Sequence, residues 1–387
     1  MAITTRNTSM TRFGVPEEVA ALPTMEFEQK LRQQGFRAID EGAELSSTGW
    51  TGLVNINDPE FTTQTIASGN FYYWGMRIDK RNVPAAVLRN EIAKVMEAEL
   101  KRTGKQFVSR ERRSEIKDIV RLRLLARVPA VPKVIQCVFD GERGTLYVGS
   151  VSSAELDIFE NLFFNTFDAL PIATSPSDRA VAVLGDGVTE ALSAIHVSEK
   201  SVEFPLYCDF LLWMWYKTDT FHGGNFTLAS GDYSAVVDGK VTVVEFHDGE
   251  VISQVDVKTK DEANEFSDMK YGLWKFERTV AKMNINVTRG DDEFNFALDA
   301  TKPNSVIVKT PAIRLNGESV LADGPFLEKM ALLDVAQNYL DDMYTLFVKT
   351  RLSTRWVKER QNINVWLEAA APECERTTIA EVAPAAT

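Results

Sequence analysis

The spacing of apolar residues predicts alternating strands and helices in the first part of the chain. A strand is expected near residues 11–15, and the helical pattern over residues 25–34 ends at Gly35. The stretch SSTGWTG at 46–52 is typical of a turn. Residues 63–78 are rich in Thr, Ile, Phe, Tyr and Trp and predict one or two strands.

Two long helices are expected next. Pro84 suits the first position of a helix, apolar residues recur at helical spacing over 87–100, and Gly104 offers a C-cap. Ser109 is a suitable N-cap for the second helix, whose apolar period continues up to Pro129. These helices would form a finger within residues 77–133.

A β-hairpin and a third helix complete the first expected domain. KVIQCVF and TLYVGSV flank DGERG at 140–144, which is the pattern of two strands joined by a tight turn. Apolar residues over 154–167 share one side of a helix. We therefore expect an N-terminal strand and helix segment at 1–44, followed by one α+β unit at 45–172.

The remaining chain is expected to form a second α+β unit at 173–325. Its predicted elements are a helix around FLLWMWYKTDT, three short strands with Asp-Gly turns at 238–239 and 248–249, a helix over 262–283, and strands near 284–299 and 304–309. A long helix at 325–351 begins a helical extension at 326–370, and 371–387 has the composition of a disordered tail. The predicted class is α+β with mixed or antiparallel sheets and long helices.

Composition favours a globular, cytoplasmic protein. The 387 residues are 44% hydrophobic and 25% charged, no apolar run approaches the length of a membrane span, and MAITTRNTSM has no hydrophobic signal region. Cys137, Cys208 and Cys374 are odd in number and widely spaced, so the sequence predicts reduced thiols rather than disulfides or a zinc site. We expect no membrane contact.

Basic residues are concentrated in one part of an acidic chain. Between Arg77 and Lys133 there are 16 Lys and Arg against 7 Asp and Glu, whereas the rest of the chain has 27 against 48, and the whole chain has a net charge of -12. Solubility alone would not require such segregation. The pattern indicates a surface for a polyanion, of which a phosphate backbone is the commonest.

The second helix of the finger carries the clearest cationic stripe. On a helical wheel Arg110, Arg113, Lys117 and Arg121 fall within about one quarter of the circumference, while Ile116, Ile119 and Leu122 point elsewhere. Further cations lie on the apolar side of that helix, in the linker and on the approach strand: Arg112, Arg123, Arg127, Lys101, Arg102, Lys105, Arg77, Lys80 and Arg81. An alternative is that Glu111, Glu115 and Asp118 pair with these cations on an ordinary solvated face.

These residues carry a resemblance to a known family. GWTG at 49–52, RIDKRNVP at 77–84, EAELKRTGK at 97–105, SRERRSEIKDIVRLRLLARVP at 109–129 and the Leu-Pro step at 170–171 occur in an order similar to that of the bacterial recombination-associated protein RdgC family. The best match covers residues 45–172. Its most specific part is the pairing of the Val-Pro at 83–84 with IKDIVRLRLLAR at 116–127.

The resemblance implies a protomer of a homodimeric ring with a positively charged central hole for double-stranded DNA. Members bind DNA with little sequence preference, associate with the nucleoid and restrain the RecA recombinase, and some relatives are catalogued as exonucleases. Ring closure in the family pairs a proline with an aromatic side chain of the partner; Pro84 matches the proline, whereas Pro129 stands where the aromatic would be. The residues expected to line the hole are Lys80, Arg81, Lys101, Arg102, Lys105, Arg110, Arg113, Lys117, Arg121 and Arg127.

Two other functions compete with this reading. A metal-dependent DNA exonuclease needs clustered carboxylates near a lysine, for which Asp238, Glu245 and the Asp256-Val-Lys258 triplet are weak candidates because acid-x-Lys triplets recur in this acidic chain. A non-catalytic scaffold would use the basic patch to bind an acidic protein.

Neither a catalytic centre nor a cofactor is expected from the remaining motifs. His196, His222 and His247 have no metal-ligand spacing, and no Gly-rich phosphate loop occurs. The aromatic clusters at 71–74 and 213–216 lie in apolar segments and predict core packing rather than stacking platforms for bases.

Overall fold

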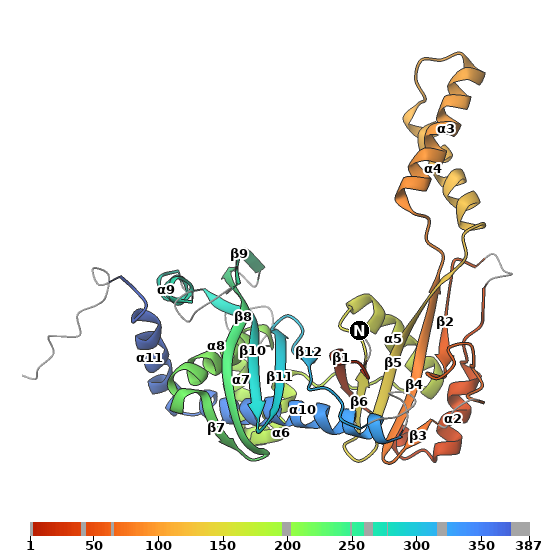
Figure 1. The fold of residues 1–387 in the computed structure, drawn as a ribbon. Helices are drawn as coiled ribbons and strands as arrows, with labels where there is room; N and C mark the ends of the chain where they lie inside the picture. Colours follow the sequence, from red (N-terminus) through yellow and green to blue (C-terminus); the bar gives the residue numbers. More distant parts are fainter. Residues whose placement is uncertain are drawn as a thin grey trace, which may run out of the picture. The chain divides into compact units, whose positions relative to one another are not determined.

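The computed structural model describes residues 3–39, 44–62, 66–195, 203–247, 250–258, 266–276, 278–315 and 323–372 (Figure 1). The fold is α+β with a large antiparallel sheet and long helices, which confirms the expected class. The chain divides into two compact units. The hairpin unit comprises Val15–Leu146 and Ala154–Pro171, and the C-terminal unit comprises Met1–Gly14, Tyr147–Ser153 and Ile172–Thr387. The domain boundaries expected from sequence stay a prediction.

Strand β4 is the centre of the hairpin unit. It pairs with β2 on one side and with β5 on the other, and most of its residues are buried. Trp74 faces Cys137 across the β4–β5 pair, and both are fully buried. The bounds are α1 Glu17–Ala20, α2 Thr24–Gln33, β2 Ser46–Thr51, β3 Ala67–Ser68, β4 Phe71–Lys80, α3 Ala85–Thr103, α4 Arg110–Leu125, β5 Val131–Asp140, β6 Thr145–Val148 and α5 Ser153–Phe167.

An aromatic core fills the hairpin unit. Trp50 of β2 packs edge-on against Trp74 and Phe159, and its indole Nε1 donates to Thr166 Oγ1 at 2.7 Å. Phe27 of α2 contacts the rings of both Trp74 and Phe167. The cluster at 71–74 therefore contributes to packing, and buried aromatic surface of this size dominates the stability of a small core.

The turn expected at 46–52 is wrong, because residues 46–51 form strand β2. Gly49 allows the backbone of β2 to lie close to the backbone at Phe36. A Cβ atom at position 49 would lie only 2.5 Å from Phe36 Cα. Phe36 N donates to Trp50 O at 2.8 Å, and Trp50 N donates to Gln34 O at 2.9 Å. The glycine lets the chain after α2 bond to β2.

The C-terminal unit combines a sheet with long helices. Its strand order is β1-β12-β11-β10-β8-β7, with β9 also paired to β8. Helix α8 packs on β8 and β10 and against α10, where Phe210 contacts Tyr344 and Phe347. The bounds are β1 Asn7–Gly14, α6 Pro176–Leu184, η1 Asp186–Val188, α7 Thr189–Ile195, α8 Glu203–Thr220, η2 His222–Gly224, β7 Asn225–Leu228, β8 Gly231–His247, β9 Glu250–Lys258, α9 Ser267–Lys275, β10 Thr279–Arg289, β11 Asp292–Asp299, β12 Ser305–Lys309, α10 Asp323–Arg351 and α11 Arg355–Glu368.

Two expected elements of this unit are corrected by the structure. The Asp-Gly turn at 238–239 lies inside the continuous strand β8, where Gly239 has a φ of 82° and the pairing with β10 shifts register, so the pair forms a bulge. The helix expected over 262–283 is only α9, and β10 already begins at Thr279 with alternating burial. The turn at 248–249, residues 262–265 and the tail from 373 onwards lie outside the described residues.

The structure also bears on the cysteines and on the possibility of a membrane-spanning helix. Cys137 and Cys208 are buried, and no disulfide joins them to another described residue. Cys374 lies outside the described residues. Burial raises the pKa of the Cys137 thiol, which makes that sulfur an inert core group. Within the described ranges, no helix combines the length and apolar character needed to cross a membrane.

Lys329 of α10 is an unusual core residue. It is 0% exposed and donates to Thr310 Oγ1 at 2.7 Å. Burial lowers the pKa of Lys329 to about 7, because the charged ammonium loses its hydration in the core.

Lys329 should make the free energy of unfolding increase with pH. In the unfolded chain the lysine holds its proton up to a pKa of about 10.4, whereas in the folded chain it holds the proton only below about 7. Between these values the unfolded state binds more protons, so stability increases by up to about 1.4 kcal/mol per pH unit. Lys329→Met should remove this rise and stabilise the protein at pH 6, as measured by urea unfolding between pH 6 and 10. Equal pH slopes for the two proteins would contradict a neutral buried lysine.

Candidate nucleic-acid interface

Helices α3 and α4 form a helical hairpin inserted between two paired strands (Figure 1). The β4–β5 ladder runs from Phe71↔Asp140 to Lys80↔Val131, so the hairpin leaves and re-enters the sheet at adjacent positions. Gly104 ends α3 with a φ of 64°. The side chain of Ser109 accepts from Arg112 N at the start of α4. The expected helices and both caps are confirmed.

The seam between the two helices is narrow. Ile116, Val120 and Leu125 of α4 are buried, whereas α3 has no fully buried residue. Two ion pairs cross the seam, Arg112 to Glu99 at 3.1 Å and Arg123 to Glu91 at 3.2 Å. These arginines lie near the apolar side, as expected, and they hold the hairpin together.

The stripe, defined as Arg110, Arg113, Lys117 and Arg121, is exposed along α4. In the part of the chain that the structure describes, none of the four makes an ion pair or a side-chain hydrogen bond. Arg113, Lys117 and Arg121 follow one another at i,i+4 spacing, which destabilises a helix by about 0.2–0.5 kcal/mol for each like-charged pair. Within α4, the ion pair found is Arg112 with Glu115. The stripe is therefore not neutralised by the carboxylates of its own helix, in contrast to the alternative considered from the sequence.

The other predicted cations fall into different environments. Lys101 and Arg102 belong to the last turn of α3 rather than to the linker, and they pair with Glu97 at 2.6 Å and Glu99 at 2.9 Å. Lys80, Lys105 and Arg127 are exposed. Lys101 and Arg102 are exposed as well, but they are paired with carboxylates. Among the described residues, Lys80, Lys105 and Arg127 make no ion pair, so this group resembles the stripe.

Two arginines of the approach strand have structural contacts. Arg81 is half-buried and donates to Ile39 O at 2.6 Å. Arg77 is 7% exposed, pairs with Asp79 at 2.7 Å and lies 4.1 Å from the centre of the Phe36 ring. Arg77 is therefore part of the core, and Arg81 anchors the foot of the hairpin.

Sequence reasoning missed Phe107 and did not predict that apolar side chains of the hairpin would be exposed. Phe107, in the loop between α3 and α4, is 79% exposed, and Ile119 and Leu122 of α4 are 58% and 61% exposed. Pro84 and Pro129 are exposed at the opposite end, where α3 begins and α4 has ended. A single Phe in the polar stretch TGKQFV was the available signal.

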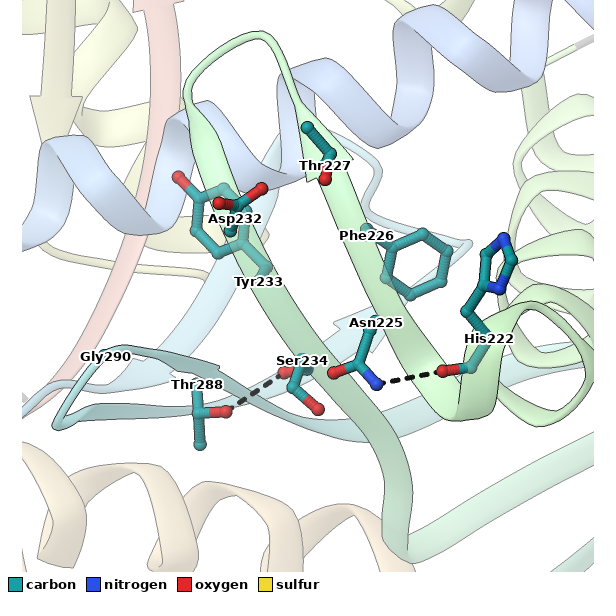
Figure 2. A pocket seen from close by; sticks show the side chains of 9 residues that line it. All are labelled: His222, Asn225, Phe226, Thr227, Asp232, Tyr233, Ser234, Thr288 and Gly290. Atoms are coloured by element: carbon teal, nitrogen blue, oxygen red, sulfur yellow. Dashed lines mark hydrogen bonds between the residues drawn. The ribbon is translucent and has the colours of Figure 1, made fainter.

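A shallow polar pocket of about 540 Å³ lies on the C-terminal unit, around the hairpin formed by β7 and β8 (Figure 2). Asn225 Nδ2 donates to His222 O at 2.9 Å, and Asp232 and Thr288 also line it. Of the described residues that line this pocket none is Lys or Arg, so these residues are poorly suited to bind a phosphate group.

Two of the three carboxylates considered for nuclease chemistry, Glu245 and Asp256, have other partners. Asp256 accepts from Lys240 at 2.9 Å and from Thr242 at 2.7 Å, and these hydrogen bonds lower the pKa of Asp256 to about 2. Glu245 accepts from Ser253 and lies 3.8 Å from Arg278. Among the described residues, no group of three His, Cys, Asp or Glu side chains could hold a metal ion.

Comparison with known proteins matches the part of the chain that contains the hairpin. A family model described as "Putative exonuclease, RdgC" matches residues 6–189. This part of the chain is RdgC-like. The chain is also 26% identical over 169 residues to the recombination-associated protein RdgC of Cupriavidus pinatubonensis (strain JMP 134 / LMG 1197), which covers 43% of this chain and 53% of that relative. The chain thus spans about half the length of the curated RdgC relative that it matches.

The RdgC-like region includes the complete hairpin unit together with β1 and α6. The stripe and the two exposed prolines all lie within it. The resemblance at 45–172 is confirmed, and the match extends beyond these residues in both directions, to residues 6 and 189. The long helix α10 and most strands of the C-terminal unit lie beyond the matched residues.

Glu99 should control the cohesion of the hairpin. Hydrogen bonds from Arg102 and Arg112 lower the pKa of Glu99, so its contribution is present at neutral pH and is lost as the pH falls below about 4. Glu99→Gln should speed amide hydrogen exchange across α3 and α4 at pH 7, measured by mass spectrometry. Glu97→Gln is the control, because the ion pair of Glu97 found among the described residues is with Lys101, within α3. Equal exchange in the two variants would show that the Glu99–Arg112 contact does not hold the helices together.

Proposed function

We propose that the α3–α4 hairpin binds the phosphate backbone of double-stranded DNA with little dependence on sequence. The observation that carries this proposal is the stripe of four exposed cations on α4, which have no carboxylate partner among the residues that the structure describes. Arg110 and Arg121 are eleven residues apart, or about 16 Å along a helix. That length corresponds to the rise of about five base pairs, so several phosphates lie within reach.

Electrostatics favour this ligand over a neutral one. The like-charged spacing of the stripe is unfavourable in the free protein and is relieved by an anion. Cations that neutralise phosphates also release condensed counterions, which supplies affinity without base contacts. The net negative charge of the remaining sequence repels DNA and directs it toward the hairpin.

The biological setting that we propose is recombination. Similarity to RdgC supports a recombination-associated role, in which two copies of the chain form a ring around duplex DNA within the nucleoid and restrain a RecA-type recombinase. A protein bound around the duplex would obstruct a recombinase filament without breaking a bond. Exposed Pro84 and Pro129 are the proposed gate residues, and Phe107 is the exposed aromatic side chain of the hairpin loop.

Removing charge from the stripe should lower both the affinity for DNA and its dependence on salt concentration. Two fewer phosphate contacts in Arg113→Gln/Lys117→Gln should reduce the log-log salt slope by about 2 and lower affinity at least tenfold at low salt. Binding of a labelled linear duplex is measured across a salt series. The control is Lys349→Gln/Lys358→Gln, which removes the same charge from exposed positions on α10 and α11, outside the hairpin. A stripe variant that binds like this control would contradict the proposed interface.

Ring formation should make DNA retention depend on DNA topology. The purified protein should have twice the 43.3 kDa chain mass by light scattering. It should stay on closed circular DNA after a high-salt wash and leave when the circle is cut. Phe107→Ser should shorten retention, whereas Met25→Ser, which changes a residue 84% exposed on α2, should not. Equal loss from circular and linear DNA would argue against encirclement.

The competing functions are separated in the same assays. Shortening of the labelled duplex that requires Mg²⁺ would favour an exonuclease, and intact DNA would favour a clamp. A scaffold that binds an acidic protein would show no affinity for the duplex. No contact among the described residues favours either alternative specifically.

A further inference from the structure

A cluster of partly buried charges joins three elements of the C-terminal unit. Arg12 of β1 donates to both carboxylate oxygens of Asp341 on α10, at 2.8 and 3.0 Å. Arg179 of α6 donates from Nη2 to the same carboxylate at 2.8 Å. Gln337, one turn earlier on α10, accepts from Arg12 Nη1 at 3.3 Å. Two guanidinium groups therefore share one carboxylate.

The cluster carries one positive charge more than its own carboxylate neutralises. The side chains of Arg12 and Arg179 are 23% and 14% exposed, and that of Asp341 is 39% exposed. Burial and repulsion from Arg12 lower the pKa of Arg179, whereas for Arg12 the Asp341 ion pair outweighs burial and raises the pKa. An excess buried charge is costly unless a counter-charge approaches it.

The two guanidinium groups are held in place without an added ligand. Arg179 lies over the Tyr344 ring, with its guanidinium carbon 4.2 Å from the ring centre. Tyr344 is itself fixed by its hydroxyl, which donates to Pro176 O at 2.7 Å. In the described part of the chain, the protein uses only Nη2 among the donor nitrogens of Arg179. Donors fixed in this way form a site that needs little reorganisation to bind an anion.

A small crevice adjoins the cluster. Its volume is about 20 Å³, enough for one water-sized group, and its walls include Arg12, Arg179, Tyr207, Ser305, Gln337 and Asp341. We propose that this crevice is a binding site for a small free oxyanion of the phosphate class. One oxygen atom of the anion enters the crevice, and the two guanidinium groups neutralise the charge of the anion. Their planar forks match tetrahedral and planar oxyanions better than they match a spherical ion.

This site is independent of the proposed DNA interface. Its residues belong to the C-terminal unit, whereas the stripe belongs to the hairpin unit. The crevice has no room for a nucleoside beside the guanidinium groups. The ligand therefore acts on the C-terminal unit, where it completes the charge balance between β1, α6 and α10.

The test removes the stripe as a competing anion site. The full-length chain with Arg110, Arg113, Lys117 and Arg121 all changed to Gln is titrated with inorganic phosphate at constant ionic strength set by chloride. Binding is measured by isothermal titration calorimetry and by the melting temperature. We expect saturable binding and a rise in melting temperature of several degrees. No phosphate effect beyond that of chloride would overturn the proposal.

Two variants give opposite outcomes. Gln337→Glu places the missing negative charge inside the cluster, so it should weaken phosphate binding at least tenfold and raise the melting temperature without phosphate. Asp341→Asn removes the internal competitor, so its phosphate affinity should rise about tenfold although the free protein is less stable. Asn364→Asp, on the exposed side of α11, is the charge-matched control for Gln337→Glu. Phosphate binding unchanged in Gln337→Glu would refute the site even if the Asp341 variant does not fold.

Discussion

The full-length pairing of β4 with β5 is the constraint on which the hairpin unit depends. Ten consecutive positions from Phe71↔Asp140 to Lys80↔Val131 are in register, so the chain can leave the sheet for about fifty residues and return beside its point of departure. Arg81 binds the backbone at Ile39, and Arg77 pairs with Asp79 beneath it. The aromatic core behind β4 makes this base rigid. A rigid base lets a thin pair of helices extend into solvent with little core of its own.

Charge within residues 77–133 has three separate uses. Arg77 and Arg81 stabilise the base, and Arg112 and Arg123 join α4 to α3. The stripe has no partner among the described residues, although forming it places like charges one turn apart. A protein surface gains nothing from that arrangement in isolation. The polyanionic ligand that we propose would compensate for this repulsion, and the stripe lies within residues 6–189, which match the RdgC family model.

Three glycines show why a glycine in the sequence does not by itself identify a turn. Gly104 ends a helix in the left-handed region, and the sequence predicted it correctly because the apolar period stops there. Gly49 and Gly239 carry the same turn signal but lie within strands: one admits the backbone of Phe36, and the other forms a bulge. The difference comes from distant chain segments that pack against them. No local window contains those segments.

The sequence by itself determined the α+β class, the two finger helices with their caps, the cationic stripe and the resemblance to RdgC. Each of these follows from short-range periodicity, capping chemistry or residue order. Only the tertiary structure decided which cations are engaged, because Arg77 and Arg102 look alike in sequence and their partners depend on folding. It also brought Arg12, Arg179 and Asp341 together from positions up to 329 residues apart. Such long-range pairing is set by the packing of β1, α6 and α10.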